Sequence, residues 1–254
     1  MCFNKDNAQA YLSDLPEIRA AGLRAFESIS IGTTNQNWKV ETDEGVWVVR
    51  KNAVNVPGVD RHIEARILQL IEPLEIAPKL IAVNPKGGYL ITEYLQGPAW
   101  ATGDCANPAL QKKLFEQLKP IHAIELNETS VSVRARVQQY LDLAPRQVKK
   151  QHQKQLYALL DDLEQLGFFE QQRLCHYDLN HTNIIGHNSI KILDWEFVGS
   201  AHPILDMAVF CVYEQVDSIK NSGNLELFQL TKKLVDLMFE VWHQIKPKHK
   251  QQQE

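Results

Sequence analysis

The segment from Arg173 to Phe197, RLCHYDLNHTNIIGHNSIKILDWEF, places charged and amide side chains beside two short apolar runs. The runs NII and IKILD predict two short strands, joined by the turn GHNS. A buried carboxylate must be paired, hydrated or bound to a metal, so Asp178 and Asp194 restrict what can surround these strands. Two interpretations are open: a surface hairpin with solvated loops, or a site that holds a divalent cation and a reacting hydroxyl group.

The spacing of three oxygen-bearing side chains is compatible with a magnesium site. Asp178 and Asn183 are five residues apart in a loop, and Asp194 ends a strand eleven residues later. A hairpin of that length brings Asn183 and Asp194 to the same end. Mg²⁺ prefers hard oxygen ligands and binds few protein groups together with phosphate oxygens. Asp178 would then be left to accept the proton of an attacking hydroxyl group.

A different metal site is the alternative for the same segment. His176, Asp178 and His181 could ligate a transition metal for hydrolysis. No further cluster of histidine or glutamate in the sequence completes such a shell.

Composition limits the class of protein. A chain of 254 residues, 44% hydrophobic and 23% charged, can bury a core as one large domain or two small lobes. The net charge of -4 argues against broad binding to nucleic acids or anionic membranes and leaves room for a cationic small molecule. The cysteines are scattered, and the sequence shows neither a signal-peptide pattern nor an apolar window near ~20 residues. We therefore expect a cytoplasmic protein without a membrane partner. The oligomeric state is not indicated.

Hydrophobic patterning predicts a β-rich part followed by a mainly helical part. A strand at 28–32 and two hairpins at 38–51 and 79–95 surround a helix at 60–74, for which Asp60 is the expected N-cap. Gly97-Pro98 breaks the pattern. We therefore place an N-terminal lobe at 1–95, a C-terminal lobe at 96–246 and a flexible tail at 247–254.

Within the C-terminal lobe, helices are expected at 107–126, 153–168, 204–216 and 227–245. Pro120 should kink or restart the first of these helices. His122, which follows it, is interpreted as a helix-packing residue rather than a catalytic one.

Two motifs in the opening segment resemble those of one kinase superfamily. The run H-Y-D-L-N-H-T-N at 176–183 resembles the H-x-D-x-x-x-x-N catalytic loop of the aminoglycoside phosphotransferase and choline kinase superfamily. D-W-E at 194–196 resembles its metal-binding motif, which stands where protein kinases have D-F-G. The match covers most of the chain and is closest to the bacterial thiamine kinase and choline kinase branch. It implies an α+β, protein-kinase-like two-lobe fold, with a small β-rich N-lobe and a mainly helical C-lobe that contains a catalytic β-hairpin.

The resemblance implies a role for each matching position of the C-terminal lobe. Asp178 is the catalytic base or the group that orients the hydroxyl, and His176 braces the loop. Asn183 and Asp194 bind Mg²⁺, which bridges the phosphates of ATP. Asp206 resembles a buried aspartate that holds the catalytic loop, with a simple helix cap as the alternative.

In the N-terminal lobe the resemblance implies a nucleotide site. Arg50 matches a basic strand residue that grips the phosphates, and Glu64 is its expected ion-pair partner; Lys51 is the alternative, but strand alternation turns it to the opposite face. The phosphate loop SIGTTNQNW has one glycine instead of three, and a polar hairpin turn would look the same. Further nucleotide contacts are implied for the loop residues Thr33, Thr34 and Asn35, and for the backbone of the hinge residues Glu93, Tyr94 and Leu95.

The acceptor is predicted less directly. A cationic alcohol would be attracted to the aromatic faces of Trp195 and Trp100 through cation–π contacts. The carboxylate of Glu196, which we count among the catalytic residues, would also suit such an acceptor. Both tryptophans could equally be core residues. The sequence thus predicts an ATP-dependent phosphotransferase acting on a small alcohol: thiamine first, then choline or ethanolamine, then an aminoglycoside. A non-catalytic nucleotide-binding pseudo-kinase and a protein kinase are the alternatives, although no A-P-E motif follows D-W-E.

Overall fold

The computed structural model describes residues 5–29, 35–216 and 224–246. These residues divide into two compact units. Described residues up to 55 and those at 78–96 form unit 1, and residues 56–77 and the described residues from 97 to 246 form unit 2.

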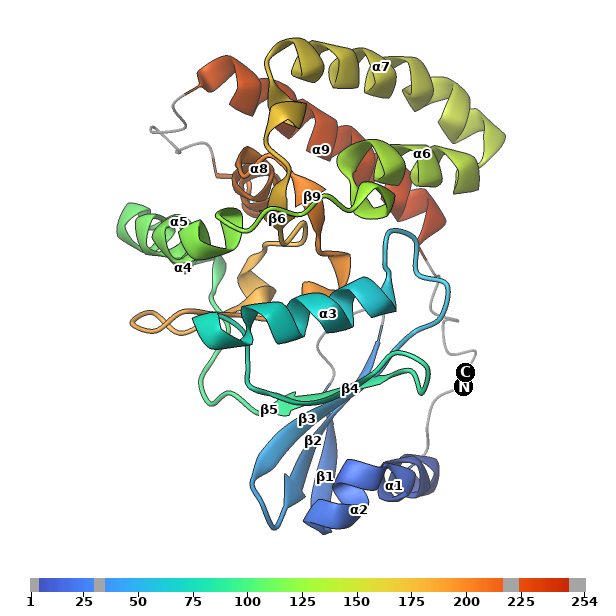
Figure 1. The fold of residues 1–254 in the computed structure, drawn as a ribbon, viewed down its shortest axis with the longest axis vertical. Coiled ribbons are helices and arrows are strands. Elements are labelled where there is room, and N and C mark those ends of the chain that lie inside the picture. Colours follow the sequence, from blue (N-terminus) through green and yellow to red (C-terminus); the bar gives the residue numbers. More distant parts are fainter. Residues whose placement is uncertain (1–4, 30–34, 217–223, 247–254) are drawn as a thin grey trace. The chain divides into compact units, whose positions relative to one another are not determined.

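Unit 1 is built on a five-stranded antiparallel sheet of strand order β1-β2-β3-β5-β4 (Figure 1). The strands are β1 Leu23–Ile29, β2 Gln36–Thr42, β3 Val46–Lys51, β4 Leu80–Asn84 and β5 Tyr89–Glu93. Both predicted hairpins are confirmed. The first strand begins at Leu23, earlier than predicted, and the end of the predicted strand lies outside the described residues.

Two helices that the sequence did not predict, α1 Lys5–Asp14 and α2 Pro16–Ala21, precede this sheet. Leu12 and Ile18 are fully buried in a cluster with Trp38 and Val49 of the sheet. Their sequence signal is weak, because α1 contains few apolar residues and α2 has only six residues. Burial of the two helices against the sheet supplies most of their stability.

Unit 2 is mainly helical (Figure 1). Its α-helices are α3 Arg61–Ile71, α4 Thr102–Cys105, α5 Pro108–His122, α6 Val133–Leu143, α7 Arg146–Gln165, α8 Ile204–Glu214 and α9 Leu225–Ile245. Its 3₁₀ turns are η1 Glu72–Leu74, η2 Thr129–Val131, η3 Phe168–Glu170, η4 His181–Asn183 and η5 Trp195–Phe197. Its short strands pair as β6 Arg173–Cys175 with β9 Gly199–Ala201, and as β7 Ile184–Ile185 with β8 Lys191–Ile192.

The helix α3 forms where the sequence predicts it but belongs to unit 2. Asp60 caps its N-terminus by accepting hydrogen bonds from the backbone N–H groups of His62 and Ile63. After α3, the N–H of Ile192 in β8 donates to the carbonyl oxygen of Ile76, at 2.7 Å. This bond explains why residues 56–77, which the sequence assigned to the first lobe, group with the C-terminal part of the chain; the lobe boundaries themselves stay a prediction.

The helix α5 continues through Pro120 to His122 instead of breaking there. Because Pro120 stands in the last turn, the helix loses one backbone hydrogen bond close to its end and needs no restart. Further along, α7 packs on α9 and buries Leu156, Leu160 and Leu163. None of the described helices combines the length and the apolar character needed to cross a bilayer.

Candidate active site

The carboxylate of Asp206 binds the loop that follows β6. It accepts hydrogen bonds from the backbone N–H groups of His176, at 3.0 Å, and Tyr177, at 2.9 Å, and it lies 2.9 Å from Nε2 of His122. Asp206 is fully buried. Its side chain therefore holds the loop, as the resemblance implies, and does not cap α8. His122 is more than a packing residue, because its ring nitrogen binds this carboxylate.

The pKa of the Asp206 carboxyl group is lowered despite its burial. Burial alone would raise the pKa of its carboxyl group, but the hydrogen bond and charge of His122, together with the charge of His176 and its N–H group, hold the pKa below its usual value. The charge thus stabilises the folded loop.

Tyr177 has a left-handed backbone conformation, with φ of 67°. Such a conformation costs of order 1–3 kcal/mol for a non-glycine residue and persists only where its surroundings impose it. Here the N–H group of Tyr177 binds Asp206, and its hydroxyl group donates to the carbonyl oxygen of Ser200 at 2.6 Å. The turn at Tyr177 sets the direction of the next residue, Asp178.

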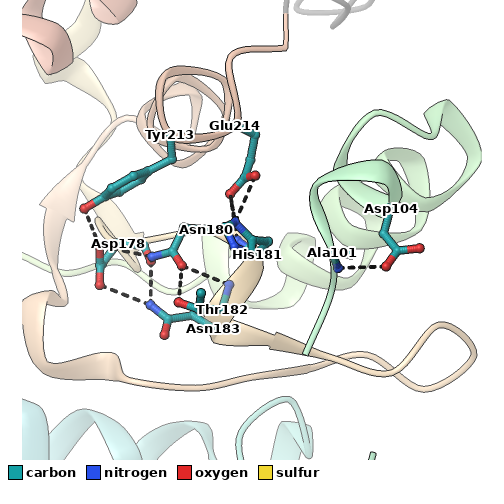
Figure 2. Close-up of polar contacts among 9 residues, drawn as sticks. All are labelled: Ala101, Asp104, Asp178, Asn180, His181, Thr182, Asn183, Tyr213 and Glu214. Carbon is teal, nitrogen blue, oxygen red and sulfur yellow. Dashed lines mark hydrogen bonds and ion pairs between the residues drawn. The ribbon is translucent and has the colours of Figure 1, made fainter. Parts of the chain in front are cut away.

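Both carboxylate oxygens of Asp178 are held by neighbouring side chains (Figure 2). The hydroxyl group of Tyr213 on α8 donates to Oδ1 at 2.8 Å, and Nδ2 of Asn183 donates to Oδ2 at 3.1 Å. Burial raises the pKa of Asp178 to about 6, with a further rise from the charge of Glu196; the bonds from Tyr213, Asn183 and Asn180 oppose that rise. A fixed carboxylate with a pKa near neutrality is suited to general-base chemistry.

Asn183 and Asp194 lie at the same end of the β7–β8 hairpin, as their spacing predicts. Ile184 pairs with Ile192, and the N–H group of Leu193 donates to the carbonyl oxygen of Asn183 at 2.8 Å. The side-chain bonds of Asn183 to Asp178 use Nδ2, and its amide oxygen points away from that carboxylate (Figure 2). One amide oxygen and the Asp194 carboxylate are donors that Mg²⁺ accepts, so these residues fit the predicted ion.

The alternative transition-metal site does not form. Nε2 of His176 donates to the carbonyl oxygen of Leu193 at 2.8 Å, and its Nδ1 accepts from the N–H group of Asp178 at 3.2 Å. His181 uses Nδ1 for the carboxylate of Glu214, at 2.9 Å. His176 is fully buried with both ring nitrogens engaged, so it braces the loop instead of ligating a metal.

Arg61, which the sequence gave no role, joins two buried carboxylates of unit 2. Its Nη1 lies 2.7 Å from Oε2 of Glu196 and 2.9 Å from Oε2 of Glu64, and each glutamate side chain is 2% exposed. The arrangement ties α3 to η5, which follows Asp194 directly. The ion pair of Arg50 with Glu64 stays a prediction; within unit 1, the buried Arg50 donates through Nε to Asn52 at 2.9 Å.

Unit 1 contains the residues predicted to contact the nucleotide. Thr33 and Thr34 lie outside the described residues, and Asn35 accepts a hydrogen bond from the N–H group of Ala53 at 3.0 Å. Lys51 places its ammonium group over the ring of Tyr11, 4.5 Å from the centroid.

The predicted hinge follows the end of β5. The N–H groups of Glu93 and Tyr94 donate to the carbonyl oxygens of Lys79 and Val46, both at 2.9 Å. No hydrogen bond among the described residues uses the N–H group of Leu95. The adenine contact predicted for this segment stays a prediction, and Leu95 is its residue with an N–H group not used by such a bond.

The two tryptophans predicted to contact the acceptor are both core residues. Trp195 and Trp100 are each 2% exposed. The indole N–H of Trp195 donates to the carbonyl oxygen of Ile192, and that of Trp100 donates to the carbonyl oxygen of Gly186, both at 2.8 Å. The ring of Trp195 also packs edge-on against His176, with centroids 4.7 Å apart. Both residues brace the hairpin and present no open face to an acceptor.

One known protein family matches most of this chain. The sequence pattern of the phosphotransferase enzyme family (APH) matches residues 25–222. A search of curated protein sequences finds no match. The match of the family confirms the superfamily predicted from the two motifs.

Three solved structures show the fold. Choline kinase LicA from Streptococcus pneumoniae has a TM-score of 0.80 at 19% identity, covering 93% of this chain and 89% of that one. A choline/ethanolamine kinase family protein from Mesorhizobium loti has a TM-score of 0.70 at 17% identity, covering 93% and 84%. The ADP-bound aminoglycoside phosphotransferase APH(2'')-Ib has a TM-score of 0.58 at 13% identity, covering 98% and 93%. At these identities the likeness concerns the fold, and it confirms the predicted fold class.

We expect Asp206→Asn to lower the free energy of unfolding by about 3 kcal/mol, because an amide NH₂ would face a backbone N–H group and leave it without an acceptor. Urea denaturation measures the change, with Asp161→Asn on the exposed face of α7 as the control. The pKa of Asp206 is lowered in the folded state, so its contribution is present above the unfolded pKa and is lost as the pH falls through the folded one. An equal loss in both variants would contradict the role of Asp206.

Proposed function

Because the chain belongs to the phosphotransferase enzyme family, we propose that it transfers the γ-phosphoryl group of ATP to the hydroxyl group of a small, cationic metabolite. The observation that carries the proposal is the fixed carboxylate of Asp178. Its oxygens are bound by Tyr213 and Asn183, and Asn183 shares one end of the hairpin with Asp194. A hydroxyl-binding carboxylate and a pair of metal ligands thus lie on one short segment.

In this proposal Asp178 binds and orients the acceptor hydroxyl group. With a pKa of about 6, it is mostly ionised at neutral pH and can accept the hydroxyl proton as the oxygen attacks the γ-phosphorus. Holding the two reactants in line supplies much of the acceleration in such a transfer. The bonds from Tyr213 and Asn183 fix the carboxylate before the acceptor arrives.

The remaining site residues are assigned to Mg²⁺ and ATP. Asn183 and Asp194 would hold the ion, which, when bound, neutralises charge on the phosphate oxygens. Arg50, with Glu64 as its partner, would bind the phosphates, and the Leu95 N–H group would bind the adenine. The remaining loop and hinge residues of the prediction, Thr33, Thr34, Asn35, Glu93 and Tyr94, keep their proposed nucleotide roles. The ADP named for one structural neighbour supports the use of a nucleotide.

Choline or ethanolamine becomes the first candidate for the acceptor. Two of the structures with the same fold are described as choline or choline/ethanolamine kinases. With the tryptophans buried, Tyr213 offers an aromatic ring that adjoins Asp178. This ring packs against Phe239 with centroids 4.6 Å apart, and the residue is 40% exposed. An exposed aromatic face beside a carboxylate suits a quaternary or primary ammonium group. Thiamine and an aminoglycoside follow as candidates.

The acceptor can be identified by Mg²⁺-dependent release of ADP from ATP, with choline, ethanolamine, thiamine and kanamycin supplied separately. We expect one of them to stimulate release, and Asp178→Asn to reduce the stimulated rate by about 10²-fold or more, since the amide cannot accept the proton. Asp161→Asn serves as the control. Wild-type turnover in Asp178→Asn would remove Asp178 from the mechanism, and ATP binding without stimulation by any acceptor would favour the pseudo-kinase.

The pH dependence of kcat/KM tests the contact between Tyr213 and Asp178. The hydrogen bond from Tyr213 lowers the pKa of Asp178, so Tyr213→Phe should raise this pKa and move the acidic limb of the profile to higher pH. Tyr157→Phe is the matched control, because the hydroxyl group of Tyr157 binds Gln138 on the protein surface. An unshifted limb in Tyr213→Phe would show that this bond does not tune the base.

A further inference from the structure

Unit 2 contains a cavity of about 120 Å³ that the proposed reaction does not use. The turn 58–60, residues 130–131, and Arg136 and Gln139 of α6 line it. One water needs only ~10–15 Å³ of such a volume, so the cavity has room for several waters or for a small ion.

Arg136 is the unusual residue of this lining. Its side chain is 3% exposed, and its Nε and Nη2 atoms are buried without a hydrogen-bond partner. Among the described residues, no carboxylate lies within 4.0 Å of its guanidinium group. The guanidinium does lie over the ring of Tyr177, 4.1 Å from the centroid.

The balance of energies calls for a partner. Burying an ion carries a large desolvation cost, which the cation–π contacts of Arg136 with the rings of Tyr177 and Phe197 offset in part. Unpaired guanidinium N–H groups add to the cost. An anion in the adjoining cavity would offset this cost, because Arg136 lines the cavity and a guanidinium group binds the oxygens of phosphate-like groups strongly.

The other polar groups of the cavity leave room for such an anion. Gln139 accepts the N–H group of Gly58 through Oε1, at 3.0 Å, which leaves its amide NH₂ as a donor. The nearest lining carboxylate, Asp60, is bound to N–H groups at the start of α3. Ser130 adds a hydroxyl group to the lining.

The cavity also adjoins the catalytic loop. Tyr177, on which Arg136 packs, directly precedes Asp178. Tyr140 lies one turn after Arg136 on α6, and its hydroxyl group approaches Gly58 so closely that a Cβ there would lie 2.8 Å from it. Burial raises the pKa of Tyr140 to about 12; the charge of Arg136 opposes that rise, and the charge of Asp178 adds to it. Tyr140 thus interacts with the arginine of the cavity and with the catalytic carboxylate.

We propose that Arg136 and the turn 58–60 bind a small tetrahedral oxyanion behind the catalytic loop. The ligand is free inorganic phosphate or the phosphate group of a phosphorylated product, which share the same chemistry. Binding neutralises Arg136 and fixes α6 against Tyr177. Binding of free phosphate is independent of turnover, whereas binding of a phosphorylated product rests on the proposed function.

Thermal unfolding of the nucleotide-free chain tests the site. Inorganic phosphate is titrated at constant ionic strength against sodium chloride, and phosphocholine is titrated in a separate arm. We expect the Tm of the wild type to rise by several degrees with saturating ligand, following mass action. Because phosphate also stabilises proteins by exclusion from their surface, variants must separate the two effects.

Arg136→Gln removes the charge and should abolish the rise in Tm that is specific to phosphate. Arg136→Lys keeps the charge but loses the planar set of guanidinium N–H donors, and should reduce that rise. Arg134→Gln is the matched control, since Arg134 lies on the same helix, pairs with Glu164 at the surface and should leave the rise unchanged. A rise with either ligand that depends on Arg136 supports the site, and the arm that gives the larger rise identifies the source. The proposal is overturned if neither ligand raises the wild-type Tm above chloride, or if an Arg136 variant that folds shows the full rise.

Discussion

The buried carboxylate of Asp206 is the interaction on which the candidate site depends. It joins α8, on which it stands, to α5 through His122 and to the loop after β6 through the N–H groups of His176 and Tyr177. These bonds impose the left-handed turn at Tyr177, and the turn directs Asp178 toward its partners. The loop that carries Asp178, the residue we propose to orient the acceptor, is thus fixed by the buried carboxylate of Asp206 in unit 2.

The desolvation cost of the buried charges in unit 2 is offset in two different ways. Asp206 has three donors, and Arg61 lies between two glutamates, so the cost of removing these ions from water is offset by direct partners. Arg136 has two aromatic rings, those of Tyr177 and Phe197, and a cavity instead. This contrast within one unit is the reason to assign the missing partner of Arg136 to a bound anion.

The sequence predicted the parts of the site that depend on local spacing. The length of one hairpin brings Asn183 and Asp194 together, and strand alternation and the Asp60 cap define the hairpins and α3. Contacts between distant residues were not predictable: Arg61 meets Glu196 across 135 positions, and Tyr213 meets Asp178 across 35. Such pairs follow from how helices pack, and neither periodicity nor motif spacing encodes that packing. The burial of both tryptophans has the same origin.

We propose that Asp178 serves the acceptor hydroxyl group while Asp194 serves the metal. Calorimetric titration of ATP, with and without Mg²⁺, into the wild type, Asp178→Asn and Asp194→Ala tests it most directly. The account predicts that Asp194→Ala loses the gain in ATP affinity that Mg²⁺ provides, and that Asp178→Asn keeps that gain within a few-fold. An unchanged Mg²⁺ dependence in Asp194→Ala, or its loss in Asp178→Asn, would contradict this division of roles.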